Sequence, residues 1–131
     1  MVDQVILHHY ENSPYAEKIR LMFGLTQSSW ASLPSPAWPP RPNVDPLSGG
    51  YRRIPIAQIG ADIFCDSTLI AREIANLNDQ PLLDPNTISG DARELMIFAE
   101  EQGFFSSIIA IPPVKLLATM VKNFGPIGAF R

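Results

Sequence analysis

The sequence predicts an α/β domain with a mixed sheet, followed by a helical segment. The apolar, β-branched stretch QVILHH at residues 4–9 predicts a buried strand, and a Ser-Pro pair just beyond it predicts the start of a helix. Further along, IPIAQIGADIFC contains two short apolar runs around a Gly-Ala-Asp turn, which is typical of an antiparallel hairpin. Strand, helix and strand followed by a hairpin and a helix give a sheet with parallel and antiparallel pairs.

The first predicted helix follows the first strand directly. We expect Ser13 to cap its N-terminus and Pro14 to take the first helical position, where a missing N–H costs nothing. We expect Gly24 to end the helix, because glycine readily adopts the left-handed conformation of a helix stop. Apolar residues recur at helical spacing and are expected to face the core: Tyr15, Ala16, Ile19, Met22 and Phe23.

A proline-rich loop follows a second predicted strand at residues 28–33. The stretch LPSPAWPPRPNVDPL can form neither a helix nor a central strand, because each proline lacks an N–H donor and restricts the residue before it. We interpret this stretch, which contains the prolines of residues 34–46, as a surface loop that replaces a helix. The alternative is a proline-rich ligand for another domain.

The hairpin and a second helix complete the first domain. Its strands are predicted at residues 56–59 and 63–65, and Asp66 and Ser67 are expected to begin the helix. The apolar positions of that helix follow the helical period: Ile70, Ile74 and Leu77.

The chain is expected to divide into a domain at residues 1–80, a polar, proline-bounded linker at 81–85, and a helical region at 86–131. The stretch SGDARELMIFAEEQGFFSSIIAI predicts a helix that Pro112 and Pro113 break, and VKLLATMVKNFG predicts another. The helical region is too short for an independent domain, so we expect an incomplete α-helical domain. Its apolar residues Ile108 and Leu116 favour association.

Composition and charge exclude several classes of partner. A net charge of -3 and a pI near 5.2 give no general attraction to nucleic acid or to an anionic membrane. The apolar runs are too short to cross a bilayer, and the N-terminus lacks the pattern of a signal peptide. One cysteine, Cys65, excludes an internal disulfide, so we expect a cytoplasmic protein.

The two histidines, His8 and His9, lie side by side in the first predicted strand. Because side chains alternate along a strand, one ring is expected to pack inside and the other to face outward. With one cysteine and no carboxylate at ligand spacing, they make a poor metal site, so we expect none.

Three stretches carry groups that could meet at one cleft. Ser13 lies at a helix N-terminus, where unpaired N–H groups and the helix dipole favour an anion. A cis Ile54–Pro55 bond would present the Ile54 backbone to an extended, peptide-like ligand. Asp66 could bind the ammonium of an amino-acid end, and Ser67 with nearby backbone N–H groups its carboxylate. Ser13, Asp66 or Ser67 could instead serve only as helix caps.

These stretches resemble motifs of the glutathione transferase family, particularly its bacterial serine- or cysteine-type members. SPYAEKIR is similar to the motif of the first helix, YRRIPIAQI to the cis-proline strand, and CDSTLIAREI to the motif that holds the γ-glutamyl group. The resemblance covers about residues 4–80 and extends into the linker and the next helix. It implies a thioredoxin-like N-terminal domain followed by an all-helical domain.

The resemblance also implies where glutathione would bind. Ile54, beside Pro55, would contact the cysteinyl backbone, and Asp66 and Ser67 would take the γ-glutamyl end. Arg53 could reach the glycyl carboxylate or belong to a solvated basic pair.

Ser13 would contact the sulfur of glutathione, which would supply the thiol that the protein itself lacks at this turn. Tyr10 is the alternative contact, because some members of the family use a tyrosine near the end of the first strand.

The function implied by the resemblance is activation of glutathione, as co-substrate, for attack on a small hydrophobic electrophile. The alternative is a non-catalytic, thioredoxin-like module that binds glutathione or a protein. A thiol–disulfide oxidoreductase is disfavoured, because neither Ser13 nor Ala16 can form a disulfide. In the family the helical domain supplies much of the dimer interface, so a homodimer is expected.

Overall fold

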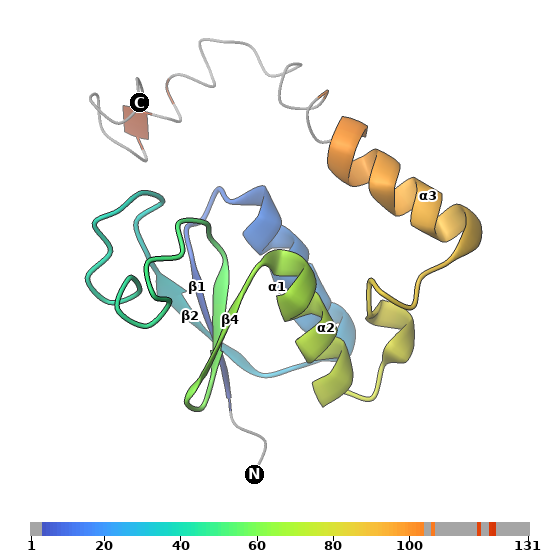
Figure 1. Cartoon of the computed structure of the whole chain (residues 1–131), viewed down its shortest axis with the longest axis horizontal. Coiled ribbons are helices and arrows are strands. Elements are labelled where there is room, and N and C mark those ends of the chain that lie inside the picture. Colours follow the sequence, from blue (N-terminus) through green and yellow to red (C-terminus); the bar gives the residue numbers. More distant parts are fainter. Residues whose placement is uncertain (1–3, 104–105, 107–117, 119–120, 123–131) are drawn as a thin grey trace. The chain divides into compact units, whose positions relative to one another are not determined.

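The computed structural model of the chain describes residues 4–103, 106, 118 and 121–122. It divides into two compact units, Met1–Thr87 and Ile88–Arg131. The first unit follows the predicted order of elements (Figure 1). Its elements are β1 (Val5–His9), α1 (Pro14–Thr26), β2 (Trp30–Pro34), β3 (Ile56–Ile59), β4 (Asp62–Cys65), α2 (Ser67–Leu77) and a 3-10 turn (Pro81–Leu83).

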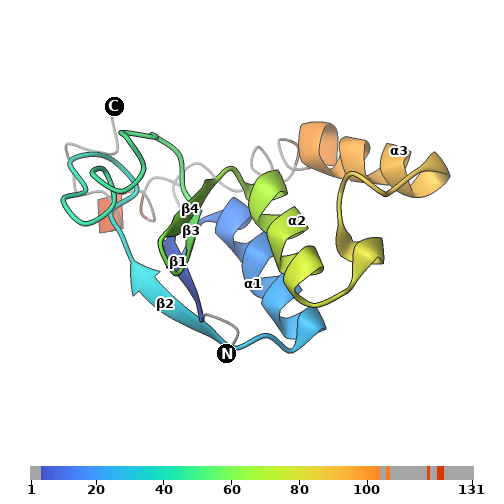
Figure 2. The same ribbon diagram turned by 60° about the horizontal axis from the view of Figure 1, so that its bottom comes forward.

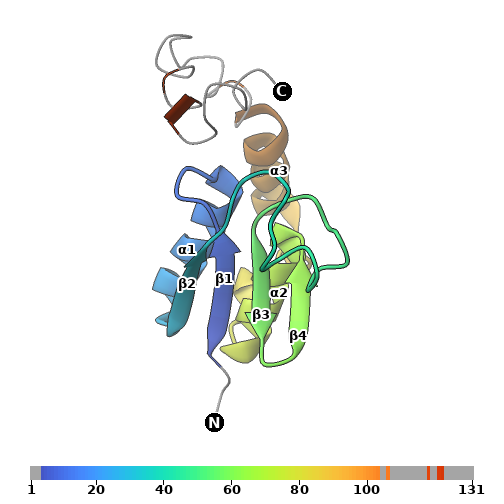
Figure 3. The same ribbon diagram turned by 90° about the vertical axis from the view of Figure 1, so that its left-hand side faces the viewer.

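The four strands form one mixed sheet with the order β2-β1-β3-β4, which Figure 3 shows face on, with the helices behind it. β1 pairs in parallel with β2, with Val5 opposite Trp30, and antiparallel with β3, with Leu7 opposite Ala57. β4 returns antiparallel beside β3. The predicted mixed sheet is therefore confirmed.

Helices α1 and α2 lie side by side on one face of the sheet (Figures 1 and 2). Their apolar stripes form the main core against the strands, because both helices place apolar residues on the side that faces the sheet. Phe23 stacks on the indole of Trp30, with ring centroids 5.0 Å apart and planes at 13°. The buried residues of this helix-side core include Val5, Leu7, Ile19, Phe23, Ile70 and Ile74.

The proline-rich loop between β2 and β3 packs on the other side of the sheet, over one end of β3 and β4 (Figure 3). Val44 from the loop packs with Ile54 and with Ile56 of β3, and we call these three residues the loop-side cluster. The loop forms no helix, as predicted, yet it does more than lie on the surface. It takes the place of a packing layer, with Val44 and Arg41 each only 1% exposed.

Two details of α1 differ from the prediction. The helix passes through Gly24 and ends at Thr26, because Gln27 adopts the left-handed conformation (φ 53°) and donates its N–H to the carbonyls of Phe23 and Gly24. Tyr15 is 42% exposed rather than in the core. It lies at the edge of the buried stripe, which is centred nearer to Ile19.

Smaller differences occur in two other elements. β2 begins at Trp30 rather than at residue 28. In α2, Ile70 and Ile74 are buried as expected, but Leu77, the last residue of the helix, is 40% exposed.

The prediction that one of the two histidines faces outward is wrong. His8 is 1% exposed and His9 is 6% exposed. The alternation along β1 is as expected, but both rings are covered. His9 lies on the helix side against Trp30 and Arg20. His8 lies opposite Ile56 of the loop-side cluster.

The second unit contains α3 (Gly90–Phe98), which continues into a π-helical segment, Ala99–Gly103. Asp91 lies in its first turn, as predicted. The predicted break at residues 112–113, the following helix and the apolar residues proposed for association lie outside the described residues. Within the described part of the chain, no helix is both long and apolar enough to span a bilayer.

Candidate functional site

Ser13 stands where β1 turns into α1, and it caps the helix as predicted. Its Oγ accepts a hydrogen bond from the N–H of Ala16 (3.2 Å), and its carbonyl accepts one from Glu17 (2.9 Å). Its own N–H donates to the carbonyl of Tyr10 (3.1 Å), which closes the turn. Because the cap uses the hydroxyl oxygen as an acceptor, the hydroxyl hydrogen can still be donated to an anion. Ser13 is only 1% exposed.

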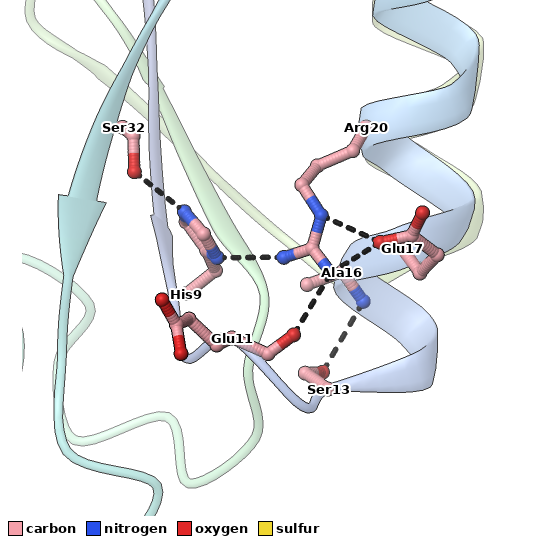
Figure 4. Close-up of polar contacts among 7 residues, drawn as sticks. All are labelled: His9, Glu11, Ser13, Ala16, Glu17, Arg20 and Ser32. Carbon is pink, nitrogen blue, oxygen red and sulfur yellow. Dashed lines mark hydrogen bonds and ion pairs between the residues drawn. The ribbon is translucent and has the colours of Figure 1, made fainter.

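Arg20 of α1 fixes the same turn from the side (Figure 4). One terminal nitrogen donates to the carbonyl oxygen of Glu11 (2.9 Å) and also contacts the carboxylate of Glu17. Its Nε donates to that carboxylate (2.7 Å), and its other terminal nitrogen lies 2.9 Å from Nδ1 of His9. The arginine therefore ties β1, the turn and α1 together directly beside Ser13.

The contacts of His9 determine its tautomer. A guanidinium has no acceptor, so Nδ1 of His9 must accept from Arg20, and the ring hydrogen lies on Nε2. Nε2 then donates to Oγ of Ser32 in β2 (2.8 Å). Burial and the positive charge of Arg20 lower the pKa of His9 below its usual 6.5. His9 is consequently a neutral imidazole at neutral pH, held edge-on to Trp30 (centroids 5.9 Å apart).

Ile54 and Pro55 lie directly before β3, and the peptide bond between them is cis. The Ile54 side chain is 8% exposed in the loop-side cluster, and Tyr10 packs against the same cluster. A second cis bond, Pro39–Pro40, occurs in the proline-rich loop.

Asp66 caps α2, where its Oδ1 accepts from the N–H of Thr68 (2.8 Å). Its side chain is exposed, and Ser67 follows as the first residue of the helix. Asp66 has φ 83° and ψ 127°, a conformation that residues other than glycine rarely adopt. Backbone conformations of this kind cost about 1–3 kcal/mol and concentrate at functional sites, which marks this position independently of the motif.

Asp66 and Arg53 each lie close enough to Tyr51 to shift its pKa. Burial raises the pKa of Tyr51, the negative charge of Asp66 raises it further, and the positive charge of Arg53 opposes this. Arg53 is exposed, whereas Tyr51 packs against the loop-side cluster. The carboxylate and the guanidinium therefore lie at the rim of this cluster.

The predicted site residues are thus arranged around the loop-side cluster. Ile54 belongs to it, Tyr10 packs on it, and Ser13 is bonded to the Tyr10 carbonyl. Arg53 and Asp66 interact with Tyr51 at the rim. No direct contact joins Ser13 to Asp66 among the contacts described.

Sequence reasoning missed Arg41 of the proline-rich loop, whose side chain is completely buried. Its Nε and backbone N–H both donate to Asp45 (2.8 Å each), and one terminal nitrogen donates to the Tyr51 carbonyl (2.5 Å). The other terminal nitrogen has no partner. Arg41 also lowers the pKa of Cys65, but the larger effect of burial leaves that pKa raised. The sequence signal that could have indicated this pair was the spacing of four residues between the oppositely charged Arg41 and Asp45.

A cavity of about 350 Å³ opens at the other end of the sheet, by the start of β1 and the C-terminal ends of both helices. Its apolar wall consists of Val5, Phe23 and Ile74, and its polar side includes Gln27 and Asn78. It does not belong to the site at the helix N-termini. In the described part of the chain, no group of three or more histidine, cysteine or carboxylate side chains is placed to hold a metal ion.

Residues 7–82, more than half of the chain, match the N-terminal domain of the glutathione S-transferase family. The chain is also similar to a GST-like protein from Pseudomonas syringae, with 34% identity, a TM-score of 0.67 and 93% of this chain covered. The chain therefore belongs to the glutathione S-transferase family, and its first unit has the thioredoxin-like fold of that N-terminal domain. Among curated proteins, none matches the chain.

Two further solved structures share the fold at 16% identity. They are the Tau class glutathione S-transferase from mango, Mangifera indica (TM-score 0.61, 79% of this chain covered), and a theta class enzyme (TM-score 0.59, 91% covered). The latter comes from the citrus canker pathogen Xanthomonas axonopodis pv. citri and has glutathione bound. The chain spans 44%, 48% and 56% of the length of these three proteins, or about half.

Proposed function

We propose that the chain binds glutathione and activates its thiol for attack on an electrophilic substrate. The observation that carries this proposal is the arrangement of three kinds of group around the loop-side cluster. A hydroxyl caps one helix at Ser13, the cis Ile54–Pro55 bond lies directly before β3, and an exposed carboxylate caps a second helix at Asp66. The relative from Xanthomonas with glutathione bound supports the choice of ligand.

Each part of glutathione has a partner of matching chemistry. The Ile54 backbone would pair with the cysteinyl residue, as an added strand pairs with a sheet edge. Asp66 would take the γ-glutamyl ammonium, while Ser67 and the N–H groups at the start of α2 would take its carboxylate. Arg53, exposed on the same rim, would take the glycyl carboxylate.

The Ser13 hydroxyl and its helix are sufficient to activate the thiol. A free thiol has a pKa of about 8.5, so lowering it by about two units requires roughly 2.7 kcal/mol of preferential stabilisation of the thiolate. A hydrogen bond to a charged group contributes about 1.5–3 kcal/mol, and a helix N-terminus adds about 0.3–1 kcal/mol. Ser13 needs only to donate its hydrogen and remains un-ionised throughout.

The reaction is a nucleophilic substitution or addition by sulfur. The thiol proton passes to solvent, the thiolate forms a carbon–sulfur bond, and a leaving group such as chloride departs with the electron pair of its bond. We propose a small hydrophobic electrophile as second substrate, a cytoplasmic setting and a homodimer. The exposed apolar residues of α3, Leu95 and Phe98, support association.

Kinetics of two variants test the assignment of the hydroxyl. Replacing Ser13 by Ala should lower the rate of conjugation of a chloronitrobenzene by roughly tenfold to a hundredfold, because the variant loses one hydrogen bond to a charged sulfur. Tyr10→Phe should change the rate less. A larger loss in Tyr10→Phe would assign the contact to Tyr10 instead.

The burial of Ser13 favours a second candidate function. At 1% exposure, its hydroxyl meets a sulfur only after neighbouring atoms move, which suits a non-catalytic module in which the serine is only a cap. Glutathione that binds saturably, with a thiol pKa unchanged from its free value, would favour this module over the transferase.

A further inference from the structure

The turn that carries Ser13 is held by a side chain that the proposed chemistry does not use. Residues 10–13 leave β1, and the bonds that hold them include the Ser13 N–H to the Tyr10 carbonyl (3.1 Å) and Arg20 to the Glu11 carbonyl (2.9 Å). The first lies within the turn. The second ties the turn to α1 and, through the same guanidinium, to His9 of β1.

We propose that Arg20 is a positioning residue for Ser13, and that it holds the turn only while His9 is neutral. The acceptor at Nδ1 of His9 fixes one arm of the guanidinium, and this orientation directs another arm to the Glu11 carbonyl. The hold on the turn follows from these contacts alone. Only its effect on catalysis rests on the proposed role of Ser13.

Protonation of His9 would turn its attractive contact with Arg20 into a repulsive one. Nδ1 would gain a hydrogen and face a donor 2.9 Å away, and two positive charges would stand in contact. Arg20, with a side chain 21% exposed, has room to swing toward solvent and Glu17. The Glu11 carbonyl then loses its partner, and the turn loosens beside the Ser13 cap.

The surroundings of His9 determine the pH at which its ring gains a proton. From α1, Arg20 opposes protonation and Glu17 favours it; from the turn, Glu11 and a backbone bond with Tyr10 favour it. From β2, the neutral Ser32 accepts from Nε2 and Trp30 lies against the ring. Burial is the largest influence and, together with Arg20, outweighs both glutamates. The pKa of His9, and with it the loosening of the turn, therefore lies below 6.5, the usual pKa of histidine.

Nuclear magnetic resonance of the uniformly ¹⁵N-labelled full chain tests the inference without requiring activity. The imidazole nitrogens report the His9 tautomer and its titration, and the Ala16 amide reports the cap, because it donates to Ser13. We expect the Nε2–H tautomer at neutral pH. In a titration from about pH 8 to pH 5, we also expect the Ala16 amide to shift with the same midpoint as His9, which lies below pH 6.5.

Three variants separate the pathway from general effects of pH. In Arg20→Gln the Ala16 shift should no longer follow His9, and in His9→Gln, where an uncharged acceptor remains, the shift should be flat across that range. Arg72→Gln, which removes an arginine paired with its neighbour Glu73 on α2, should leave the coupling intact. An Ala16 amide that is constant through the His9 titration of the wild type, or that follows it unchanged in Arg20→Gln, would overturn the proposal.

If the chain also conjugates glutathione, the pH profile adds a catalytic readout. The wild-type kcat should fall on the acid side at the His9 midpoint, and His9→Gln should remove that limb without changing KM for glutathione. Arg20→Gln should lower kcat by about tenfold to a hundredfold, as misplacement of a catalytic group by about 1 Å does. A chain without transferase activity would refute the proposed function, while the Ala16 titration would still decide the role of Arg20.

Discussion

Two arginine clusters, one partly exposed and one buried, lie on opposite faces of the sheet and hold backbone next to the candidate site in different ways. Arg20, on the helix side, donates to the Glu11 carbonyl, two residues before Ser13. Arg41, on the loop side, donates to the Tyr51 carbonyl, three residues before Ile54. Each arginine thus anchors one segment of the site.

The clusters differ in solvent contact and in the partners of the guanidinium. The Arg20 side chain is 21% exposed and shares its charge with an exposed glutamate and a titratable histidine. The Arg41 side chain is fully buried, with Asp45 as its counter-ion. The comparison teaches that one anchor can respond to pH while the other is a fixed part of the core.

Removal of the counter-ions should show the largest difference. Asp45→Ala leaves a buried guanidinium without a carboxylate and should lower the free energy of unfolding by about 3 kcal/mol, the lower end for a broken buried pair because Asp45 is 28% exposed. Glu17→Ala removes an exposed pair and should cost at most about 1 kcal/mol. Urea unfolding of both variants measures this, and equal losses would contradict the distinction between the anchors.

Ser13 variants sharpen the comparison on the helix side. Ser13→Ala should lower the free energy of unfolding by about 1 kcal/mol, and Ser13→Gly by only a few tenths, because glycine is a tolerable N-cap. Both remove the hydroxyl, so both should lose conjugation to the same extent. A Ser13→Gly variant that keeps wild-type turnover would show that the serine acts only as a cap.

The smallest expected effect is the pH dependence of stability. The pKa of His9 is lower in the folded chain than its usual 6.5, so the unfolded chain binds more protons between these two values. The free energy of unfolding should therefore be constant above about pH 6.5 and fall as the pH drops below it. Urea titrations at a series of pH values measure this slope, which His9→Gln should reduce; an unchanged slope in that variant would contradict the assignment to His9.

Local sequence rules predicted the parts of the site that depend on near neighbours. The order of elements followed from periodicity, and the caps at Ser13 and Asp66 followed from residue type beside a helical pattern. The contact between Arg20 and His9 was not predictable in this way, because it joins residues on two elements across a turn. The burial of Arg41 was missed because a loop rich in proline with an arginine favours the surface.

Calorimetric titration of glutathione into the wild type and into Asp66→Asn tests the central claim most directly. Asparagine keeps the N-cap and tolerates a positive φ, so the variant removes the charge and little else. Asp62→Asn, which changes an exposed carboxylate at the start of β4, is the matched control. We predict saturable binding that Asp66→Asn weakens by roughly tenfold to a hundredfold and Asp62→Asn leaves unchanged. Absence of binding to the folded wild type, or equal affinity in all three proteins, would contradict the account.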